Sequence, residues 1–243
     1  MILPAIRERP SPNHDGRGEP ARIDMLVLHY TGMSSAAAAL DRLCDAAAQV
    51  SAHYLVEEDG TVWRLVPEIC RAWHAGLSSW QGESALNAVS IGIEIVNPGH
   101  EGGYPPFPEP QMAAVEALCR DIVARHGIAG HRVVGHSDIA PDRKRDPGEL
   151  FDWRRLARAG IGIWPEPRAA SAPAESGRLD RSAALRALAE IGYAVAPATE
   201  TAVLAAFQRR FRQACCDGEL DRETAARIVE VSRAFAQGRQ VGQ

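Results

Sequence analysis

The pattern of apolar residues in the first part of the chain predicts several buried strands. Ile23–Tyr30 (IDMLVLHY) and Val89–Asn97 (VSIGIEIVN) are near-continuous apolar runs, which are typical of strands covered on both faces. A shorter run, Arg132–Ser137 (RVVGHS), predicts another strand. Ala52–Val66 predicts two strands joined by a tight turn at Asp59–Gly60.

Stretches with helical spacing separate these strands. The alanine-rich stretch Met33–Ala48, with Ser34 or Ser35 as N-cap, predicts a helix. Gln111–His126 has apolar residues at helical spacing and is followed by a glycine, and Glu149–Ala159 predicts a further helix. Strands interleaved with helices predict the α/β class, with a mixed central sheet flanked by helices.

The C-terminal part of the chain has a different pattern. Composition shifts to Pro, Ala, Ser and Glu between Trp164 and Arg181, which indicates a linker. Ser182–Ile191 and Thr201–Phe211 are amphipathic, and a third helix is expected to begin near Asp221. These patterns predict a small all-α C-terminal domain. The expected division is a main domain at 1–164, a linker at 165–180 and a three-helix domain at 181–238.

Composition narrows the possible partners. The 243 residues are 46% hydrophobic and 24% charged, as in an ordinary globular protein with one main core. A net charge of −4 gives no electrostatic sign of nucleic acid or anionic lipid as a partner. We expect a monomer.

The compartment is predicted from the N-terminus and the cysteines. No apolar run approaches the roughly 18 residues that cross a bilayer. Charges at Arg7, Glu8 and Arg9 interrupt the apolar start, so the apolar region of a secretory signal is missing. The five cysteines form no CxxC pair, which favours free thiols. The chain as written is expected in the cytoplasm; a removed export segment would place it in the periplasm or at the outer membrane.

Two histidines and an aspartate have the residue types of a catalytic metal site. His29 closes an apolar strand, a position that by itself more often holds a structural histidine. His136 ends another strand, and Asp146 follows ten residues later across a loop braced by Pro141 and Pro147. Two imidazoles and one carboxylate are ligands of catalytic zinc sites that keep a position open for water.

Two further charged residues fit hydrolytic chemistry. Glu94 interrupts an apolar strand, where a structural salt bridge and a general base are both plausible explanations. Alternation would point Lys144 and Asp146 to the same side of an extended segment, so an ammonium beside the metal could stabilise an oxyanion. Arg145 is expected to be solvated.

The chain resembles the type 2 N-acetylmuramoyl-L-alanine amidases, a zinc family whose fold is shared with peptidoglycan recognition proteins. The resemblance covers most of residues 15 to 165 and is carried by LVLHYTG, SAHYLVEEDG, RAWHAG, SIGIEIVN and GHSDIAPDRKRDPG. It implies one catalytic Zn²⁺ on His29, His136 and Asp146, with Glu94 and Lys144 as the catalytic pair. It also implies a substrate-binding role for Trp73, His74, Ala75, Gly76 and Arg143. His53 in SAHYLV is expected to be buried and structural.

The C-terminal helices resemble the small three-helix peptidoglycan-binding domain. Phe207–Gln208 match its FQ signature and Gly192–Tyr193 its GY pair. A docking or stabilising unit would show the same amphipathic pattern, so this alternative stays open.

The implied activity is hydrolysis of the bond between the lactyl group of N-acetylmuramic acid and L-alanine in peptidoglycan fragments. For a cytoplasmic enzyme, the expected substrates are 1,6-anhydro-muropeptides released during cell-wall recycling. The alternatives are a recognition module that binds muropeptides without cutting them and a metal-dependent endopeptidase acting within the stem peptide.

Overall fold

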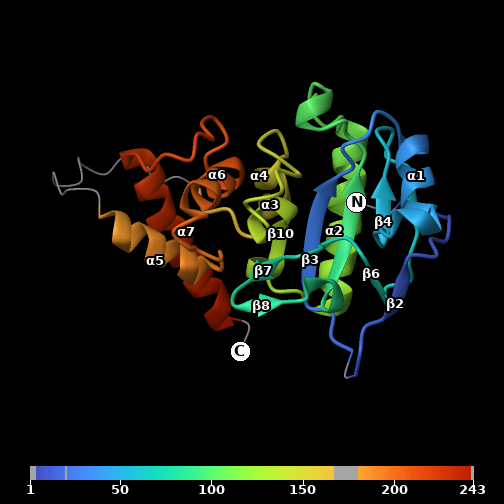
Figure 1. The fold of residues 1–243 in the computed structure, drawn as a ribbon, viewed down its shortest axis with the longest axis horizontal. Coiled ribbons are helices and arrows are strands. Elements are labelled where there is room, and N and C mark those ends of the chain that lie inside the picture. The colour runs from blue at the N-terminus through green and yellow to red at the C-terminus, as the bar shows by residue number, and fades with distance from the viewer. Residues whose placement is uncertain (1–3, 20, 167–179, 242–243) are drawn as a thin grey trace.

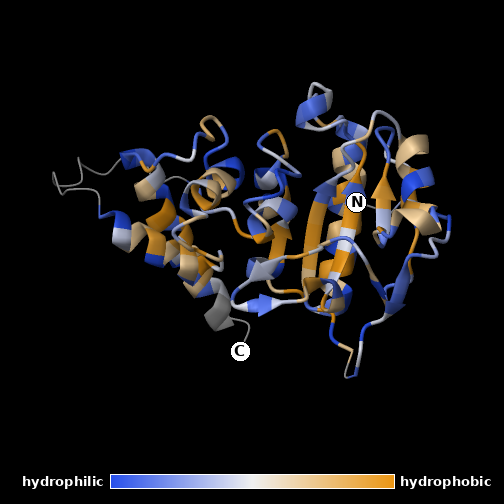
Figure 2. Ribbon diagram, viewed as in Figure 1, coloured by the Kyte–Doolittle hydropathy of each residue, from blue (hydrophilic) through white to orange (hydrophobic). Residues whose placement is uncertain are grey.

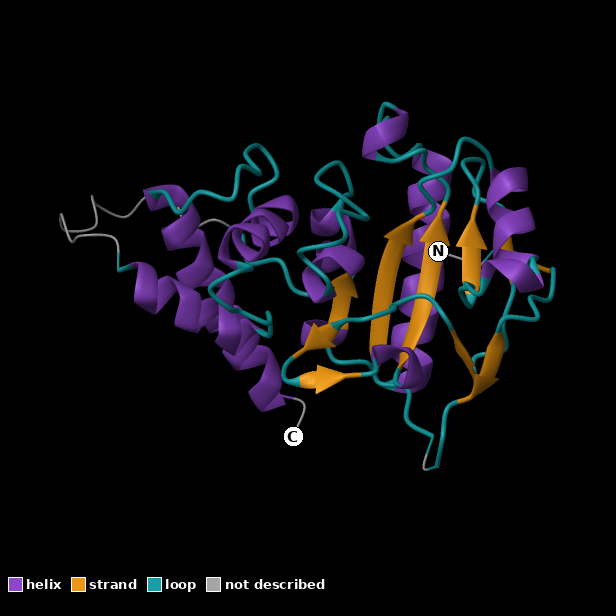
Figure 3. Ribbon diagram, viewed as in Figure 1, coloured by secondary structure: helices purple, strands orange, loops and turns teal. Residues whose placement is uncertain are grey.

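A six-stranded mixed sheet forms the centre of the molecule (Figures 1 and 3). The computed structural model describes residues 4–19, 21–166 and 180–241. The strands follow the order β1-β5-β4-β9-β3-β10, and every neighbouring pair is parallel except β4 and β5. The six strands are β1 (Ile6–Glu8), β3 (Met25–Tyr30), β4 (Tyr54–Val56), β5 (Val62–Arg64), β9 (Ser90–Ile95) and β10 (Val133–Gly135).

The central strands are buried because helices cover the sheet. Residues 25–28 of β3 are fully buried, and Figure 2 shows hydrophobic residues concentrated in the central strands. The helix α2 (Glu109–His126) contributes Val115, Leu118 and Ile122 to the same core. A smaller apolar cluster joins α1 (Ala36–Cys44) to Leu55 and Val96. The predicted fold class, a mixed sheet flanked by helices, is confirmed.

Short elements complete the main part of the chain. Two small sheets pair β2 with β6 and β7 with β8. These strands and the remaining short helices are β2 (His14–Gly16), β6 (Cys70–Ala72), β7 (Ser79–Trp80), β8 (Glu83–Ser84), α3 (His136–Ile139), α4 (Trp153–Arg158) and the 3₁₀ turns Ala46–Ala48, Leu86–Ala88, His100–Gly102 and Gly130–Arg132. In the described residues no helix is long and apolar enough to span a membrane.

Several local predictions changed in detail. The turn at Asp59–Gly60 joins two antiparallel strands as expected, and Ser35 is the N-cap of α1. His136 does not end a strand: it is the first residue of α3, directly after β10. The predicted helix Glu149–Ala159 is shorter, because the Asp152 side chain caps α4 by accepting from the Arg155 N–H.

The C-terminal helices lie together at one end of the molecule, next to β10 and α3 (Figure 1). They are α5 (Arg181–Ile191), α6 (Glu200–Phe211) and α7 (Arg222–Val241). Asp180 and Asp221 cap α5 and α7 through their side chains. Most of the predicted linker, residues 167–179, lies outside the described residues.

These helices share one continuous apolar core with the sheet part of the chain. The Trp80 and Tyr193 rings pack edge to face at 5.1 Å, and the Gln81 N–H donates to the Gly192 carbonyl at 2.8 Å. A Cβ on Gly192 would come within 2.8 Å of the Trp80 ring, so a glycine is needed for this close approach. The two parts of the chain are therefore packed closely against each other.

Candidate active site

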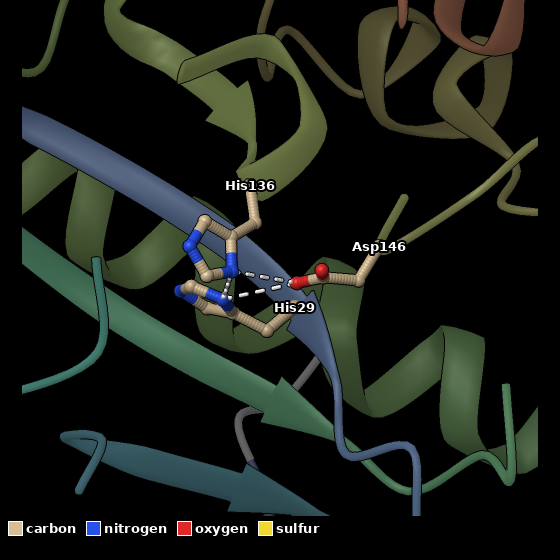
Figure 4. A group of neighbouring side chains, drawn as sticks. All are labelled: His29, His136 and Asp146. Carbon is tan, nitrogen blue, oxygen red and sulfur yellow. Dashed lines mark hydrogen bonds and ion pairs between the residues drawn. The ribbon is translucent and has the colours of Figure 1, made fainter. Parts of the chain in front are cut away.

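His29, His136 and Asp146 converge at the carboxyl ends of the parallel strands (Figure 4). Their ligand atoms all lie within 4.8 Å of one another. The Nδ1 atoms of the two histidines are 2.9 Å apart, and Asp146 Oδ2 lies 3.0 Å from His136 Nδ1 and 3.2 Å from His29 Nδ1. All three side chains are buried. The structure thus brings together the three residues that the sequence analysis singled out, as a group that could hold a metal ion.

The fold brings the three residues together from separate segments. His29 lies near the end of β3, and His136 follows the adjacent parallel strand β10. Asp146 reaches the site from a loop, which is fixed because the Ser137 N–H donates to the Asp146 carbonyl at 2.8 Å. Ligands at the carboxyl ends of parallel strands follow the general rule for open α/β sheets.

Glu94 lies on the strand next to His29. The two residues are partners in the register of β3 and β9. One carboxylate oxygen, Oε2, is shielded from solvent and accepts no hydrogen bond from the described residues. Burial, and then the nearby negative charge of Asp146, raises the pKa of Glu94 well above its usual value, while Lys144 acts in the opposite direction. A carboxylate in this state fits a general base better than a structural ion pair.

A pocket of about 420 Å³ opens over this group. Glu94, His136 and Asp146 line it, and Lys144 lies on its wall together with Arg143 and Arg145. Lys144 is held by a turn, since its N–H donates to the Ala140 carbonyl at 2.9 Å, and the segment is not the extended strand assumed in the sequence argument. Lys144 nevertheless shares the pocket with Asp146.

Comparison with known proteins agrees with this geometry. Residues 19–149, more than half of the chain, match the family model described as N-acetylmuramoyl-L-alanine amidase. The chain belongs to this family. The resemblance and fold class inferred from sequence motifs are thereby confirmed.

Two kinds of relative stand out. The amidase AmiD of Escherichia coli is 41% identical over 230 residues, which cover 84% of this chain and 80% of AmiD. The 1,6-anhydro-N-acetylmuramyl-L-alanine amidase AmpD of Enterobacter cloacae is 36% identical over 168 residues, which cover 62% of this chain and 87% of AmpD.

Solved structures extend the comparison to the C-terminal helices. E. coli AmiD, in complex with the substrate anhydro-N-acetylmuramic acid-L-Ala-D-gamma-Glu-L-Lys, matches with a TM-score of 0.79, 39% identity and 93% coverage of both chains. AmpDh3 of Pseudomonas aeruginosa, in complex with an anhydromuramic pentapeptide, matches with a TM-score of 0.77 and 34% identity, over 93% of this chain and 95% of AmpDh3. Both matches extend well beyond the residues of the family model.

The predicted substrate-binding residues have different surroundings. Trp73, His74 and Arg143 line the pocket, whereas Ala75 and Gly76 are not among its lining residues. Arg143 donates to the Leu77 carbonyl, which links its side chain to the residue after Gly76. The His74 ring is turned inward: its Nδ1 lies 3.0 Å from His29 Nε2 and its Nε2 lies 3.1 Å from the Ser90 hydroxyl.

His53 is completely buried and lies outside the metal-binding group, as expected. Its Nδ1 accepts from the Gly92 N–H at 3.0 Å, and its Nε2 lies 2.8 Å from the Arg17 guanidinium. Burial, and then the charge of Arg17, lowers the pKa of His53 to about 3. These contacts give it a structural place beneath the site.

Sequence reasoning missed an aromatic cluster on the pocket wall. The His100 and Tyr104 rings are stacked at 4.3 Å, and His100 Nδ1 lies 2.9 Å from the Tyr30 hydroxyl. His100 Nε2 also contacts Glu149 at 3.0 Å. Tyr30 and His100 line the pocket. His100 and Tyr104 belong to a loop rich in Pro and Gly, whose periodicity gave no signal for this cluster.

The motif residues of the C-terminal helices point inward. Phe207, Gln208 and Tyr193 are buried, and the Gln208 amide donates to Asp217 at 3.0 Å and to the Thr224 hydroxyl at 3.1 Å. These residues hold the helices together and against the sheet part of the chain. The alternative of a docking or stabilising unit gains support from these contacts.

Proposed function

We propose that the protein is a zinc-dependent N-acetylmuramoyl-L-alanine amidase. It hydrolyses the amide between the lactyl group of N-acetylmuramic acid and L-alanine in peptidoglycan fragments, 1,6-anhydro-muropeptides among them. One observation carries the proposal: the group of His29, His136 and Asp146 lies at one open pocket with Glu94, whose Oε2 accepts no hydrogen bond from the described residues. The complexes of AmiD and AmpDh3 with anhydromuramic peptides support this substrate class.

The donor set fits zinc. Two imidazole nitrogens and one carboxylate oxygen are a usual ligand set for a catalytic zinc ion, which keeps a further position open. When bound, zinc supplies Lewis acidity, which polarises the scissile carbonyl and eases ionisation of the attacking water. Burial of His29, and then the neighbouring His136, lowers the pKa of His29 to about 4, so its imidazole is neutral at pH 7 and able to act as a ligand.

The residues of the chain would carry the proton transfers. Glu94 takes a proton from the water that attacks the lactyl carbonyl carbon. The Lys144 ammonium stabilises the negative charge that develops on the carbonyl oxygen. The carbon–nitrogen bond then breaks, and Glu94 passes its proton to the departing L-alanine nitrogen. Trp73 and Arg143, on the pocket wall, would contact the sugar or the stem peptide.

An assay with a defined substrate distinguishes the amidase from the two alternatives, an endopeptidase and a non-catalytic recognition module. Purified protein is incubated with anhydro-N-acetylmuramyl tripeptide, with and without a chelator, and the products are weighed by mass spectrometry. An amidase releases the unsubstituted anhydro sugar and a peptide that begins with L-alanine, and a chelator abolishes both products. Products that keep L-alanine on the sugar would indicate an endopeptidase. Intact substrate at full zinc loading would indicate a recognition module.

The organisation and location of the enzyme are part of the proposal. Residues 1–164 would carry the chemistry, and the helices at 181–238 would stabilise that part or hold it at the cell wall. The proposed state is a monomer in the cytoplasm, with the periplasm or outer membrane as the alternative. The five cysteines are all unpaired, which suits a reducing compartment. Cell fractionation and light scattering test these two points.

A further inference from the structure

The outer nitrogens of both histidine ligands contact two consecutive residues. His29 Nε2 lies 3.0 Å from His74 Nδ1, and His136 Nε2 lies 3.3 Å from the Ala75 carbonyl. Both histidines therefore point Nδ1 toward the candidate metal position, and the contacts of Nε2 on the opposite side of each ring fix their orientation. A metal ligand's second nitrogen sets its tautomer and the orientation of its ring. One short segment is thus in position to set both ligands.

The direction of each hydrogen bond behind His29 can be assigned from chemistry. The Ser90 hydroxyl lies 2.6 Å from the Leu86 carbonyl, which can only accept, so Ser90 donates its proton there. Its oxygen must then accept from His74 Nε2–H at 3.1 Å. A neutral His74 has no second proton, so its Nδ1 accepts from His29 Nε2–H. The His29 proton is therefore on the outer nitrogen.

His136 follows the same logic. The Ala75 carbonyl accepts, so the single proton of a neutral His136 is on Nε2. Both inner Nδ1 atoms then present lone pairs to each other at 2.9 Å, with an Asp146 oxygen at 3.0 and 3.2 Å. When both histidines are neutral, no proton is left to bridge these three acceptors. This arrangement is unfavourable by itself and is relieved by a cation.

The fold fixes the segment that makes these contacts. The Asn87 side-chain carbonyl accepts from the His74 N–H at 3.1 Å and from the Ala75 N–H at 2.8 Å. A Cβ on Gly92 would lie 2.4 Å from the His74 ring, so a glycine is required for the ring to lie where it does. Ser90, Gly92 and Glu94 alternate along β9 and so face the same side of the strand.

We propose that His74 and Ser90 are positioning residues that fix the tautomer of His29 and thereby the affinity of the metal site. The backbone carbonyl of Ala75 fixes the tautomer of His136 in the same way. The inference deepens the proposed function and rests on it for the identity of the metal. His74 would thus orient the His29 ligand through a hydrogen bond, in addition to lining the pocket.

The first test measures zinc affinity. Ser90→Ala removes the acceptor of His74 Nε2–H without touching a ligand, and the expected result is a 10- to 100-fold weaker zinc Kd, as for other residues behind metal ligands. Zinc Kd is measured by competition with a chromophoric chelator. Ser11→Ala is the matched control: Ser11 is also buried and also donates to a carbonyl, that of Leu43, at 2.5 Å. This variant should bind zinc like the wild type.

The second test needs no substitution. Ring-nitrogen NMR shifts of the metal-free wild type should show the proton of His29, His74 and His136 on Nε2 in each case. A His29 proton on Nδ1, or equal zinc affinities for Ser90→Ala and Ser11→Ala, would overturn the inference. A wild type that binds zinc with this dependence on Ser90 but leaves muropeptides intact would support the inference and refute the proposed amidase.

Discussion

Glu94 and Asp138 are carboxylates that lie close to the two histidines of the proposed metal site, and their surroundings are opposite in kind. Glu94 neighbours His29 across β3 and β9, and its shielded Oε2 accepts no hydrogen bond from the described residues. Asp138 lies two residues after His136 and is only 1% exposed. The strand β10, the helix α6 and the segment after α5 each supply a donor to Asp138, whereas no described residue supplies one to Glu94 Oε2.

The partners of Asp138 come from two parts of the chain. Its oxygens accept from the Gly135 N–H at 2.8 Å, from the Arg210 guanidinium at 2.7 Å and from the Tyr193 hydroxyl at 2.6 Å. Arg210 also donates to the Val133 carbonyl at 2.8 Å. Asp138 thus caps the turn that begins with His136 and joins it to α6 and to the residue pair after α5.

This difference is the one expected between a structural carboxylate and a catalytic one. A buried charge with several donors holds its neighbours in one arrangement, and removing one partner leaves the other uncompensated. A buried carboxylate without donors is costly, and its raised pKa makes it a better proton acceptor near neutral pH. We expect substitutions at the two positions to affect different properties.

The largest expected effect is on stability, at Asp138. Asp138→Asn keeps the shape of the side chain but leaves the Arg210 guanidinium buried without a counter-charge, and the expected loss is about 3–5 kcal/mol in the free energy of unfolding. Urea denaturation of the zinc-loaded protein measures it. The control is Glu200→Gln, which breaks the more exposed pair of Arg181 and Glu200 and should cost about 0–1 kcal/mol. Similar losses in both variants would contradict the comparison.

Glu94→Gln should produce the second-largest effect, and on turnover only. The amide cannot take a proton from water, so kcat should fall by a factor of about 10² or more. Stability should be unchanged or higher, because a neutral amide is less costly to shield from water than a carboxylate. Zinc content should stay the same. Full activity would show that Glu94 is not the base, and a loss of stability like that of Asp138→Asn would show that it is structural.

The sequence indicated the residues around Glu94 better than it indicated the buried contact between Asp138 and Arg210. The apolar runs of β3 and β9 are visible because parallel strands are buried on both faces, and the motif matches then marked His29, Glu94 and Asp146. Arg210 has no such signal. In an amphipathic helix an arginine usually faces solvent, and its burial depends on Asp138, 72 residues earlier in the chain.

Ring directions could not be predicted from the motifs either. The resemblance assigned His74 to the substrate, but the direction of its ring depends on Gly92 and Ser90, which meet it only in the folded chain. The strand β1 was missed for a related reason. Its residues Ile6–Glu8 are mostly charged, and it exists because the edge of β5 offers backbone partners.

The smallest expected effects are shifts in the pH dependence of kcat/KM, which test the raised pKa of Glu94. The proposed mechanism requires the carboxylate form of Glu94, and burial followed by the charge of Asp146 raises its pKa well above 4.5. The acidic limb of kcat/KM should therefore lie above pH 4.5. Lys144 lowers this pKa, so Lys144→Met should move the limb to higher pH as well as reduce kcat, while Lys144→Arg should leave the limb in place.

The raised pKa of Glu94 also has a consequence for stability. Between 4.5 and the pKa of folded Glu94, the native protein holds a proton that the unfolded chain has released. Native stability from this group is therefore complete at low pH and is lost as pH rises through the folded pKa. Glu94→Gln cannot titrate, so its stability relative to the wild type should increase across this window. A pH-independent difference between the two proteins would mean that the folded pKa of Glu94 is not raised.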